Sequence, residues 1–211
     1  MLLRTLGRGC MAGGFAMLLA AAPSSAQGGR LVLTPFFGGV IPTARLGSLR
    51  IGGLTPQPFI FGAEVNTGGA LGGRVGYWIG ERWGVEGSYF WSSADVRLTG
   101  GPFSATREAE LQGGTLKLFW QATAAGTGTD ILLSGGLMGI EHRGSAFLLA
   151  ADQFDVGGAI GAGLHVEMSP LVTFRVDGDM LVYKWACGCG FPATTQTDVL
   201  MTVGLGIRFS R

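Results

Sequence analysis

The sequence predicts an all-β fold, an eight-stranded antiparallel up-and-down transmembrane β-barrel with long extracellular loops and short periplasmic turns. Three observations predict it: apolar and polar residues alternate, glycine is spread through the alternating stretches, and long connections alternate with short ones. Only 14% of the 211 residues are charged, against about 25% in a soluble domain. The 39 glycines disfavour helices, because each interior glycine costs a helix about 1 kcal/mol.

The final stretch, Asp198 to Phe209, shows the alternation most clearly. Every second residue from Val199 is apolar, and the residues between are polar or small, apart from Leu200. Since successive side chains of a strand point to opposite faces, this strand has one apolar face. Such a strand suits lipid outside and a polar lumen inside. Unpaired backbone amides are not tolerated in hydrocarbon, so the sheet must close into a barrel.

Seven other segments alternate similarly, and each covers the roughly 9 to 11 residues of a tilted membrane strand. The eight predicted strands are residues 30–40, 69–80, 83–96, 109–121, 130–142, 154–168, 171–183 and 198–209. Connections 41–68 and 184–197 are long, whereas 81–82 and 169–170 are tight. Both termini therefore lie with the short turns, at the periplasmic end. We expect Phe59 to Val65 to extend the second strand beyond the membrane.

The alternation also predicts which side chains face the lumen. In the seventh strand Val172 and Phe174 face lipid, which leaves the polar residues between them inside, and Trp78 is predicted to point inward. The fourth strand does not alternate cleanly, because Leu111 and Leu116 fall on opposite faces. We predict a β-bulge at Gly113-Gly114, which would put both leucines on the lipid-facing side.

The predicted lumen is filled with charge. An isolated buried charge costs several kcal/mol, so these groups are expected to pair. An eight-stranded lumen is just wide enough for side chains, so the pairs would plug it. The predicted lumen ion-pair network consists of Arg74, Glu86, Lys117, Asp155, His165, Glu167, Arg175, Asp177, Asp179 and Arg208.

The N-terminus carries the three parts of a secretory signal peptide. Arg4 and Arg8 precede a short apolar run, which ends in the small residues Ser24, Ser25 and Ala26. The run is shorter than the roughly 20 residues of a membrane helix, which weakens the alternative of a retained anchor. We therefore predict a cleaved signal at 1–26 and a barrel at 27–211, exported to the periplasm and inserted in the outer membrane.

Four segments resemble those of small eight-stranded bacterial outer-membrane barrels of the OmpA/OmpX-like "outer membrane protein beta-barrel domain" kind. The resemblance covers essentially the whole mature chain. It implies that Phe209 is the terminal aromatic read by the barrel-assembly machinery, although Ser210 and Arg211 follow it. The segments are Leu33–Gly39 (LTPFFGG), Gly80–Glu86 (GERWGVE), Met168–Asp177 (MSPLVTFRVD) and Val203–Phe209 (VGLGIRF).

Catalytic and cofactor sites are not predicted, so the protein is not expected to be an enzyme. The only histidines, His142 and His165, lack the His-x-Ser pattern of the family's lipid-A-modifying relatives. Asp177 and Asp179 lie mid-strand without the further oxygen ligands of a calcium site, so no metal is expected either. The formal net charge of +1 gives no nucleic-acid footprint.

Two cysteines remain after the signal is removed. Cys187 and Cys189 lie in the last long loop, in an oxidising compartment. A C-x-C pair is too short for relaxed disulfide geometry, but the flanking glycines favour an intraloop disulfide over intermolecular pairing. Metal binding by the two thiols is the third alternative.

Two functions fit these features. The first is a structural, surface-exposed, monomeric barrel with a charge-plugged lumen, whose loops contact lipopolysaccharide, other envelope components or external partners. The alternative is a narrow pore or lateral carrier for small or apolar solutes. In that case the first loop would contribute a hydrophobic gate formed by Pro56, Pro58, Phe59, Ile60 and Phe61.

Overall fold

The computed structural model describes residues 29–43, 47–51, 59–100, 103–123, 128–145, 153–185 and 194–209. No helix among these residues is long and apolar enough to cross a membrane. The predicted signal peptide, Cys187 and Cys189 lie outside the described residues. The strands are β1 (Arg30–Pro42), β2 (Gly47–Ile51), β3 (Phe59–Val65), β4 (Gly68–Trp78), β5 (Trp83–Gly100), β6 (Phe103–Gln121), β7 (Thr129–Arg143), β8 (Gln153–Ser169), β9 (Val172–Trp185) and β10 (Thr194–Phe209).

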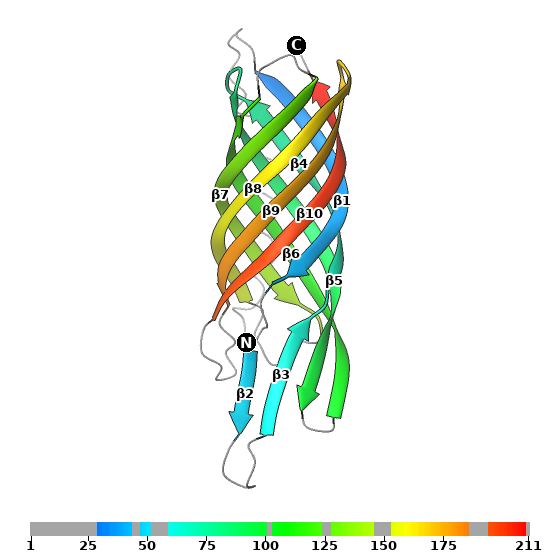
Figure 1. Ribbon diagram of the computed structural model, residues 1–211, viewed down its shortest axis with the longest axis vertical. Coiled ribbons are helices and arrows are strands. Elements are labelled where there is room, and N and C mark those ends of the chain that lie inside the picture. The colour runs from blue at the N-terminus through cyan, green and yellow to red at the C-terminus, as the bar shows by residue number, and fades with distance from the viewer. Residues whose placement is uncertain are drawn as a thin grey trace, which may run out of the picture.

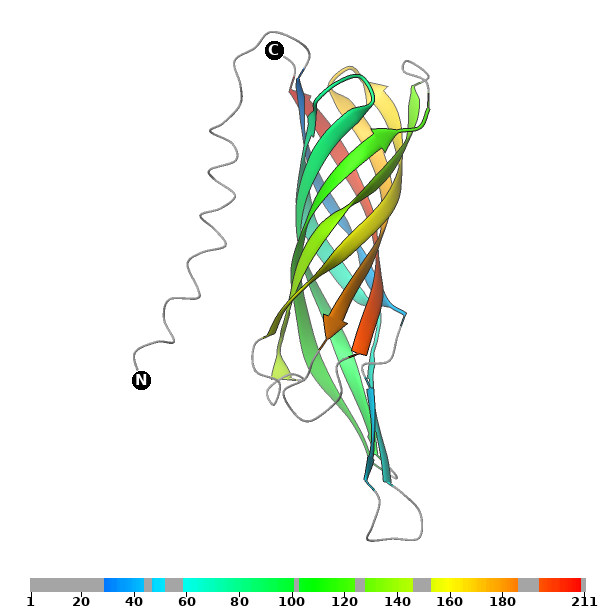
Figure 2. The ribbon, with the colours of Figure 1, turned by 90° about the vertical axis from the view of Figure 1, so that its left-hand side faces the viewer.

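Eight of these strands close into a ring, as the alternation predicted. Each pairs antiparallel with its neighbour in the order β1, β4, β5, β6, β7, β8, β9 and β10, and β10 pairs back with β1. Figures 1 and 2 show the resulting cylinder of tilted strands. β1 begins and β10 ends at the same end as the turns after β4 and β8, which is the predicted periplasmic end (Figure 1).

The outer surface of the barrel is apolar. On β5 the outward side chains from Trp83 to Trp91 are mostly aromatic or aliphatic, whereas Ser93, Asp95 and Arg97 follow in the same row. The apolar part has the length that a membrane strand requires, about 9 to 11 residues. Other outward apolar side chains that are well exposed include Leu33, Phe37, Leu71, Leu116, Leu137, Val156, Ile160 and Leu205.

A sheet of four strands rises beyond the membrane band. β5 and β6 are 18 and 19 residues long, and their outer parts continue into β3 and β2 in the order β2, β3, β5, β6. β3 pairs with β5, from Phe61 opposite Gly100 to Val65 opposite Val96, and it directly precedes β4 in the chain. The predicted extension of the second strand is therefore confirmed. β2 lies within the connection 41–68, for which the sequence predicts a loop. Figure 1 shows β2 and β3 clear of the cylinder.

The predicted bulge at Gly113-Gly114 is wrong. β6 pairs through both glycines with β5 and with β7 without a register shift. Leu111 points inward and is 4% exposed, while Leu116 points outward and is 57% exposed. Leu111 can stay inward without a bulge, because this part of the lumen is itself apolar. The irregularity that occurs in the described ladders lies between Glu167 and Ser169, at the end of β8.

The extracellular half of the lumen holds an apolar layer. Its members come from all around the ring, and most are almost completely buried. Gly113 leaves room for one of them, because a Cβ at this position would lie 2.7 Å from the Phe90 ring. We call six of these residues the apolar layer: Phe36, Val40, Phe90, Ile140, Leu181 and Leu200.

Candidate functional site

Six charged side chains gather in the periplasmic half of the lumen, and we call them the charge network. Three cations face three carboxylates, so the formal charges balance. Each residue is at most 7% exposed. Alternation on tilted strands brings them together, since every one occupies an inward position of its strand. The six are Arg74 on β4, Glu86 on β5, Lys117 on β6, and Arg175, Asp177 and Asp179 on β9.

Arg74 spans the lumen from β4 to β9. Its guanidinium donates to Asp177 Oδ2 through Nη1, and through Nη2 to Asp179 Oδ2 at 3.0 Å and to Thr202 Oγ1 at 2.9 Å. The guanidinium carbon also lies 4.7 Å from the centre of the Phe36 ring. Arg74 therefore joins the charge network to the apolar layer.

The two other cations complete the network. Arg175 Nη2 donates to Glu86 Oε2 at 2.8 Å and to Asp177 Oδ1 at 3.1 Å. Lys117 Nζ donates to Asp179 Oδ1 at 2.6 Å and lies 3.7 Å from Glu86 Oε1. Each carboxylate thus has at least two cationic neighbours, which offsets the cost of burying it.

His165 lies at the edge of the network. It pairs directly with Arg175 in the β8–β9 register, within the range expected from the sequence for these two residues. Its Nε2 lies 3.3 Å from Asp177 Oδ1. His165 therefore adds a hydrogen-bonding partner at Asp177 Oδ1, whereas Arg74 donates to Oδ2 of the same carboxylate.

Two glycines that the sequence reasoning did not single out make room for the carboxylates. Gly161 and Gly163 of β8 are the register partners of Asp179 and Asp177. A Cβ on Gly161 would lie 2.0 Å from Asp179 Oδ1, and a Cβ on Gly163 would lie 2.2 Å from Asp177 Oδ1. The sequence feature that could have identified them is their spacing, because both glycines occupy lumen-facing positions of the same strand.

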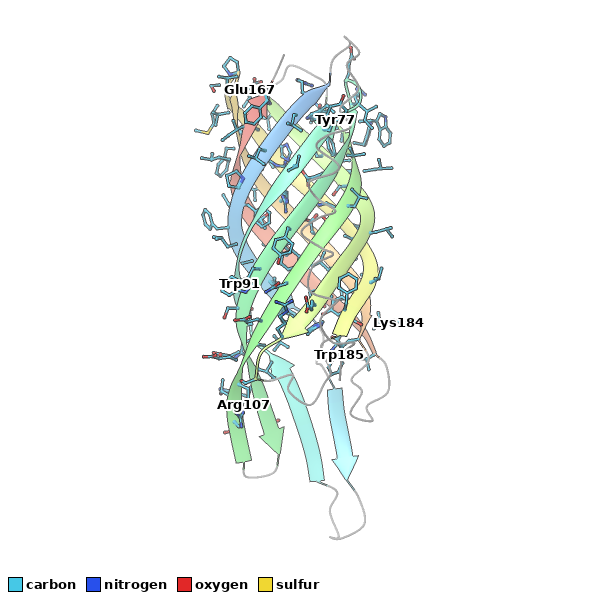
Figure 3. The ribbon with its side chains drawn as sticks, turned by 180° about the vertical axis from the view of Figure 1, so that it is seen from behind. Tyr77, Trp91, Arg107, Glu167, Lys184 and Trp185 are labelled. Carbon is cyan, nitrogen blue, oxygen red and sulfur yellow. The ribbon has the colours of Figure 1, made fainter. Side chains whose placement is uncertain are left out.

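Three predicted members of the network lie elsewhere. Arg208 Nη1 donates to Glu167 Oε1 at 2.8 Å, and the Glu167 side chain is 40% exposed. Figure 3 shows Glu167 at the periplasmic end of the barrel. Asp155 lies on the extracellular side, where its Oδ2 is 3.6 Å from His142 Nδ1. The strand ends, not the lumen centre, therefore hold these three charges.

The periplasmic end of the lumen is narrow. Trp78 lines a cavity of about 40 Å³ there, as its predicted inward orientation requires. Its ring meets the edge of the Phe119 ring, with a centroid separation of 4.8 Å. A cavity of this size holds a few water molecules at most.

A second polar group closes the extracellular end of the apolar layer. Tyr183 donates to Asp198 Oδ2 at 2.8 Å, and its hydroxyl lies 3.3 Å from His142 Nε2. These contacts tie the outer ends of β7, β9 and β10 together. Within the described ranges, no group of three or more His, Cys, Asp or Glu side chains is arranged to hold a metal ion.

Comparison with protein-family models gave no match, and comparison with curated protein sequences gave none either. Solved structures do match. Outer membrane protein OprG of Pseudomonas aeruginosa gives a TM-score of 0.64 at 16% identity, over 87% of this chain and 97% of that chain. Neisserial surface protein A gives 0.56 at 11% identity, over 87% and 100% of the two chains. Outer membrane protein AlkL gives 0.53 at 16% identity, over 90% and 96%.

At these identities the likeness shows the fold. The chain has the fold of the small eight-stranded outer-membrane β-barrels. A closed barrel with an apolar outer surface is built to stand in lipid, and bacterial barrels of this kind stand in the outer membrane. The fold and the outer surface together place the protein in the bacterial outer membrane.

Proposed function

We propose that this protein is a closed outer-membrane barrel, whose lumen does not conduct and whose extracellular sheet and loops contact envelope components or external partners. The observation that carries the proposal is the filling of the lumen by two successive layers. The charge network is compensated internally, and the apolar layer lies above it. A solute would have to cross both.

The apolar layer is the stronger barrier. Phe90, Ile140, Leu181 and Leu200 are 0% exposed, and Phe36 is 4% exposed. Hydrophobic constrictions stop ions by excluding water, because no polar group there replaces the hydration shell. The charge network contributes stability and a fixed geometry, but the seal does not depend on any single ion pair.

The outer surface supports contacts with lipid and lipopolysaccharide. Trp83 and Trp120 lie together at the periplasmic boundary, with ring centroids 6.2 Å apart, where interfacial aromatics are found. Lys184 is exposed at the opposite end of the cylinder (Figure 3). A cation at this boundary suits a lipid phosphate. Phe209 is 51% exposed at the end of β10 and is proposed as the aromatic for the barrel-assembly machinery.

The test is solute entry into liposomes that contain the refolded barrel. We expect small charged and small apolar solutes to enter no faster than into protein-free liposomes. A steady, solute-selective flux would overturn the proposal and favour a narrow pore or lateral carrier instead. A barrel denatured before reconstitution controls for leakage caused by protein that has not inserted.

A further inference from the structure

Four titratable side chains form a row across the extracellular end of the lumen. Asp155 Oδ2 on β8 lies 3.6 Å from His142 Nδ1 on β7. His142 Nε2 lies 3.3 Å from the hydroxyl of Tyr183 on β9, and the same hydroxyl lies 2.8 Å from Asp198 Oδ2 on β10. We call these four residues the His142 cluster. Its three contacts connect four consecutive strands of the ring.

The His142 cluster buries two carboxylates without a neutralising cation. His142, Tyr183 and Asp198 are each 4% exposed, and Asp155 Oδ2 is buried and accepts no hydrogen bond. Neither carboxylate forms an ion pair with a lysine or arginine of the described strands. Because an uncompensated buried charge is costly, the cluster favours the uptake of positive charge.

The charged neighbours of the cluster on its own strands point away from it. Glu141 and Arg143 flank His142 on the outer face of β7, where Arg143 Nε donates to Glu141 Oε1 at 2.8 Å. Lys184 follows Tyr183 on the outer face of β9 and is exposed. The titratable groups that face His142 from the described strands are therefore Asp155, Tyr183 and Asp198. Uncharged residues pack around them: Leu111 of β6, Gln196 of β10, Pro42 of β1 and Val65 of β3.

The three contacts need one proton more than the cluster holds when its imidazole is neutral and its carboxylates are ionised. A carboxylate only accepts, so the Tyr183 hydroxyl donates to Asp198, and its oxygen can accept from His142 Nε2–H. A neutral imidazole carries a single N–H, so Nδ1 then faces Asp155 Oδ2 as a second acceptor. The other tautomer moves the conflict to Nε2 and the Tyr183 oxygen. One additional proton, on His142 or on Asp155, removes the conflict.

We propose that the His142 cluster binds one additional proton at pH 7 and acts as a pH-sensitive lock on the extracellular end of the barrel. The bound proton holds the ends of β7, β8, β9 and β10 together. Its loss leaves two buried carboxylates and two acceptors that face each other. The lock acts where the β8–β9 ladder ends, since the last extracellular register pair joins Gly157 and Tyr183. This inference goes beyond the proposed function and does not depend on whether the lumen conducts.

The additional proton makes the stability of the barrel depend on pH. A histidine in the unfolded chain has a pKa of about 6.5, so His142 is neutral there above about pH 7, whereas the folded cluster keeps its proton. The folded state therefore binds one proton more, and the barrel loses stability as the pH rises. The unfolding equilibrium constant rises by up to about tenfold per pH unit until the folded cluster releases the proton.

Asparagine at position 155 tests the proposal. Asp155→Asn keeps the shape of the side chain, and its amide can donate to His142 Nδ1, so the cluster needs no additional proton. Asp95→Asn is the matched control, because it removes a carboxylate that is exposed on the outer face of β5. Urea unfolding of the refolded barrels in lipid vesicles is measured at pH 7 and at pH 9. All other titratable groups are the same in the parent and in both variants, so their effects cancel in the comparison.

We expect the unfolding constants of the parent and of Asp95→Asn to rise at least tenfold more between pH 7 and pH 9 than that of Asp155→Asn. Asp198→Asn repeats the test from the other end of the row and serves if Asp155→Asn does not fold. Its amide donates to the Tyr183 oxygen, so the hydroxyl is released to donate to His142 Nε2. A parent whose stability is the same at both pH values, or asparagine variants whose pH dependence matches that of the parent, would overturn the proposal.

Discussion

Replacing Arg175 by alanine should destabilise the barrel strongly. Arg175 donates to Glu86 and Asp177, with its shortest contact at 2.8 Å, and it is 6% exposed. Its removal leaves three carboxylates with two cations in the charge network. Breaking a buried ion pair by deleting one partner costs about 3–5 kcal/mol. Asp177 keeps Arg74 and Glu86 keeps Lys117, so the lower end, about 3 kcal/mol, is expected.

Arg208→Ala is the matched control. It removes the same side chain from an ion pair at the periplasmic mouth, where the Glu167 partner is 40% exposed. Exposed pairs contribute about 0–1 kcal/mol. Urea titration of each refolded variant in lipid vesicles, followed by tryptophan fluorescence, gives the free energies of unfolding. If the two variants lose the same stability, the charge network does not hold the lumen together.

A double variant separates charge balance from loss of packing. Arg175→Met keeps much of the side-chain volume, and adding Glu86→Gln removes the carboxylate that Arg175 neutralised. Because a buried pair can be replaced as a unit at little cost, the double variant should recover at least half of the stability that Arg175→Met loses. Strict additivity of the two single changes would refute the pairing argument.

Two other changes have defined outcomes. Gly163→Ala should lower the free energy of unfolding by about 1–3 kcal/mol, as overpacking does, because the added Cβ would lie 2.2 Å from Asp177 Oδ1. Gly158→Ala should leave the free energy of unfolding unchanged in the same titration, because the atom nearest to its Cβ would be 3.8 Å away. Leu137→Arg, on the lipid face where the leucine is 66% exposed, should cost about 2–4 kcal/mol. Ser93→Arg, above the apolar band, should change folding yield in vesicles little, and equal effects of both arginines would contradict the placement of the band.

The strands and their faces could be predicted because both depend on a local period of two. β5 begins at the predicted Trp83, and Arg175, Asp177 and Asp179 point inward as the alternation of β9 requires. Alternation is a property of one strand at a time, so it needs no knowledge of the neighbours. The extracellular sheet was predicted in part, because residues 59–65 were expected to extend the second strand beyond the membrane.

The height of each side chain along the lumen could not be predicted. It depends on the tilt and stagger of strands far apart in the sequence; Arg74 meets Asp179 over a separation of 105 residues. For this reason Glu167 and Arg208 were grouped with residues deep in the lumen. The bulge at Gly113-Gly114 was inferred because Leu111 was assumed to need lipid, whereas an apolar layer inside the barrel receives it.

The apolar layer is the central element of this account, and single-channel conductance in planar bilayers tests it most directly. Phe90 and Leu181 are both 0% exposed, and Phe90→Ala with Leu181→Ala would open the layer while leaving the charge network intact. We expect no conductance steps from the parent or from Arg175→Ala, and reproducible steps from the double variant once its folding is verified. Steps from the parent, or from Arg175→Ala while the double variant stays silent, would contradict the account.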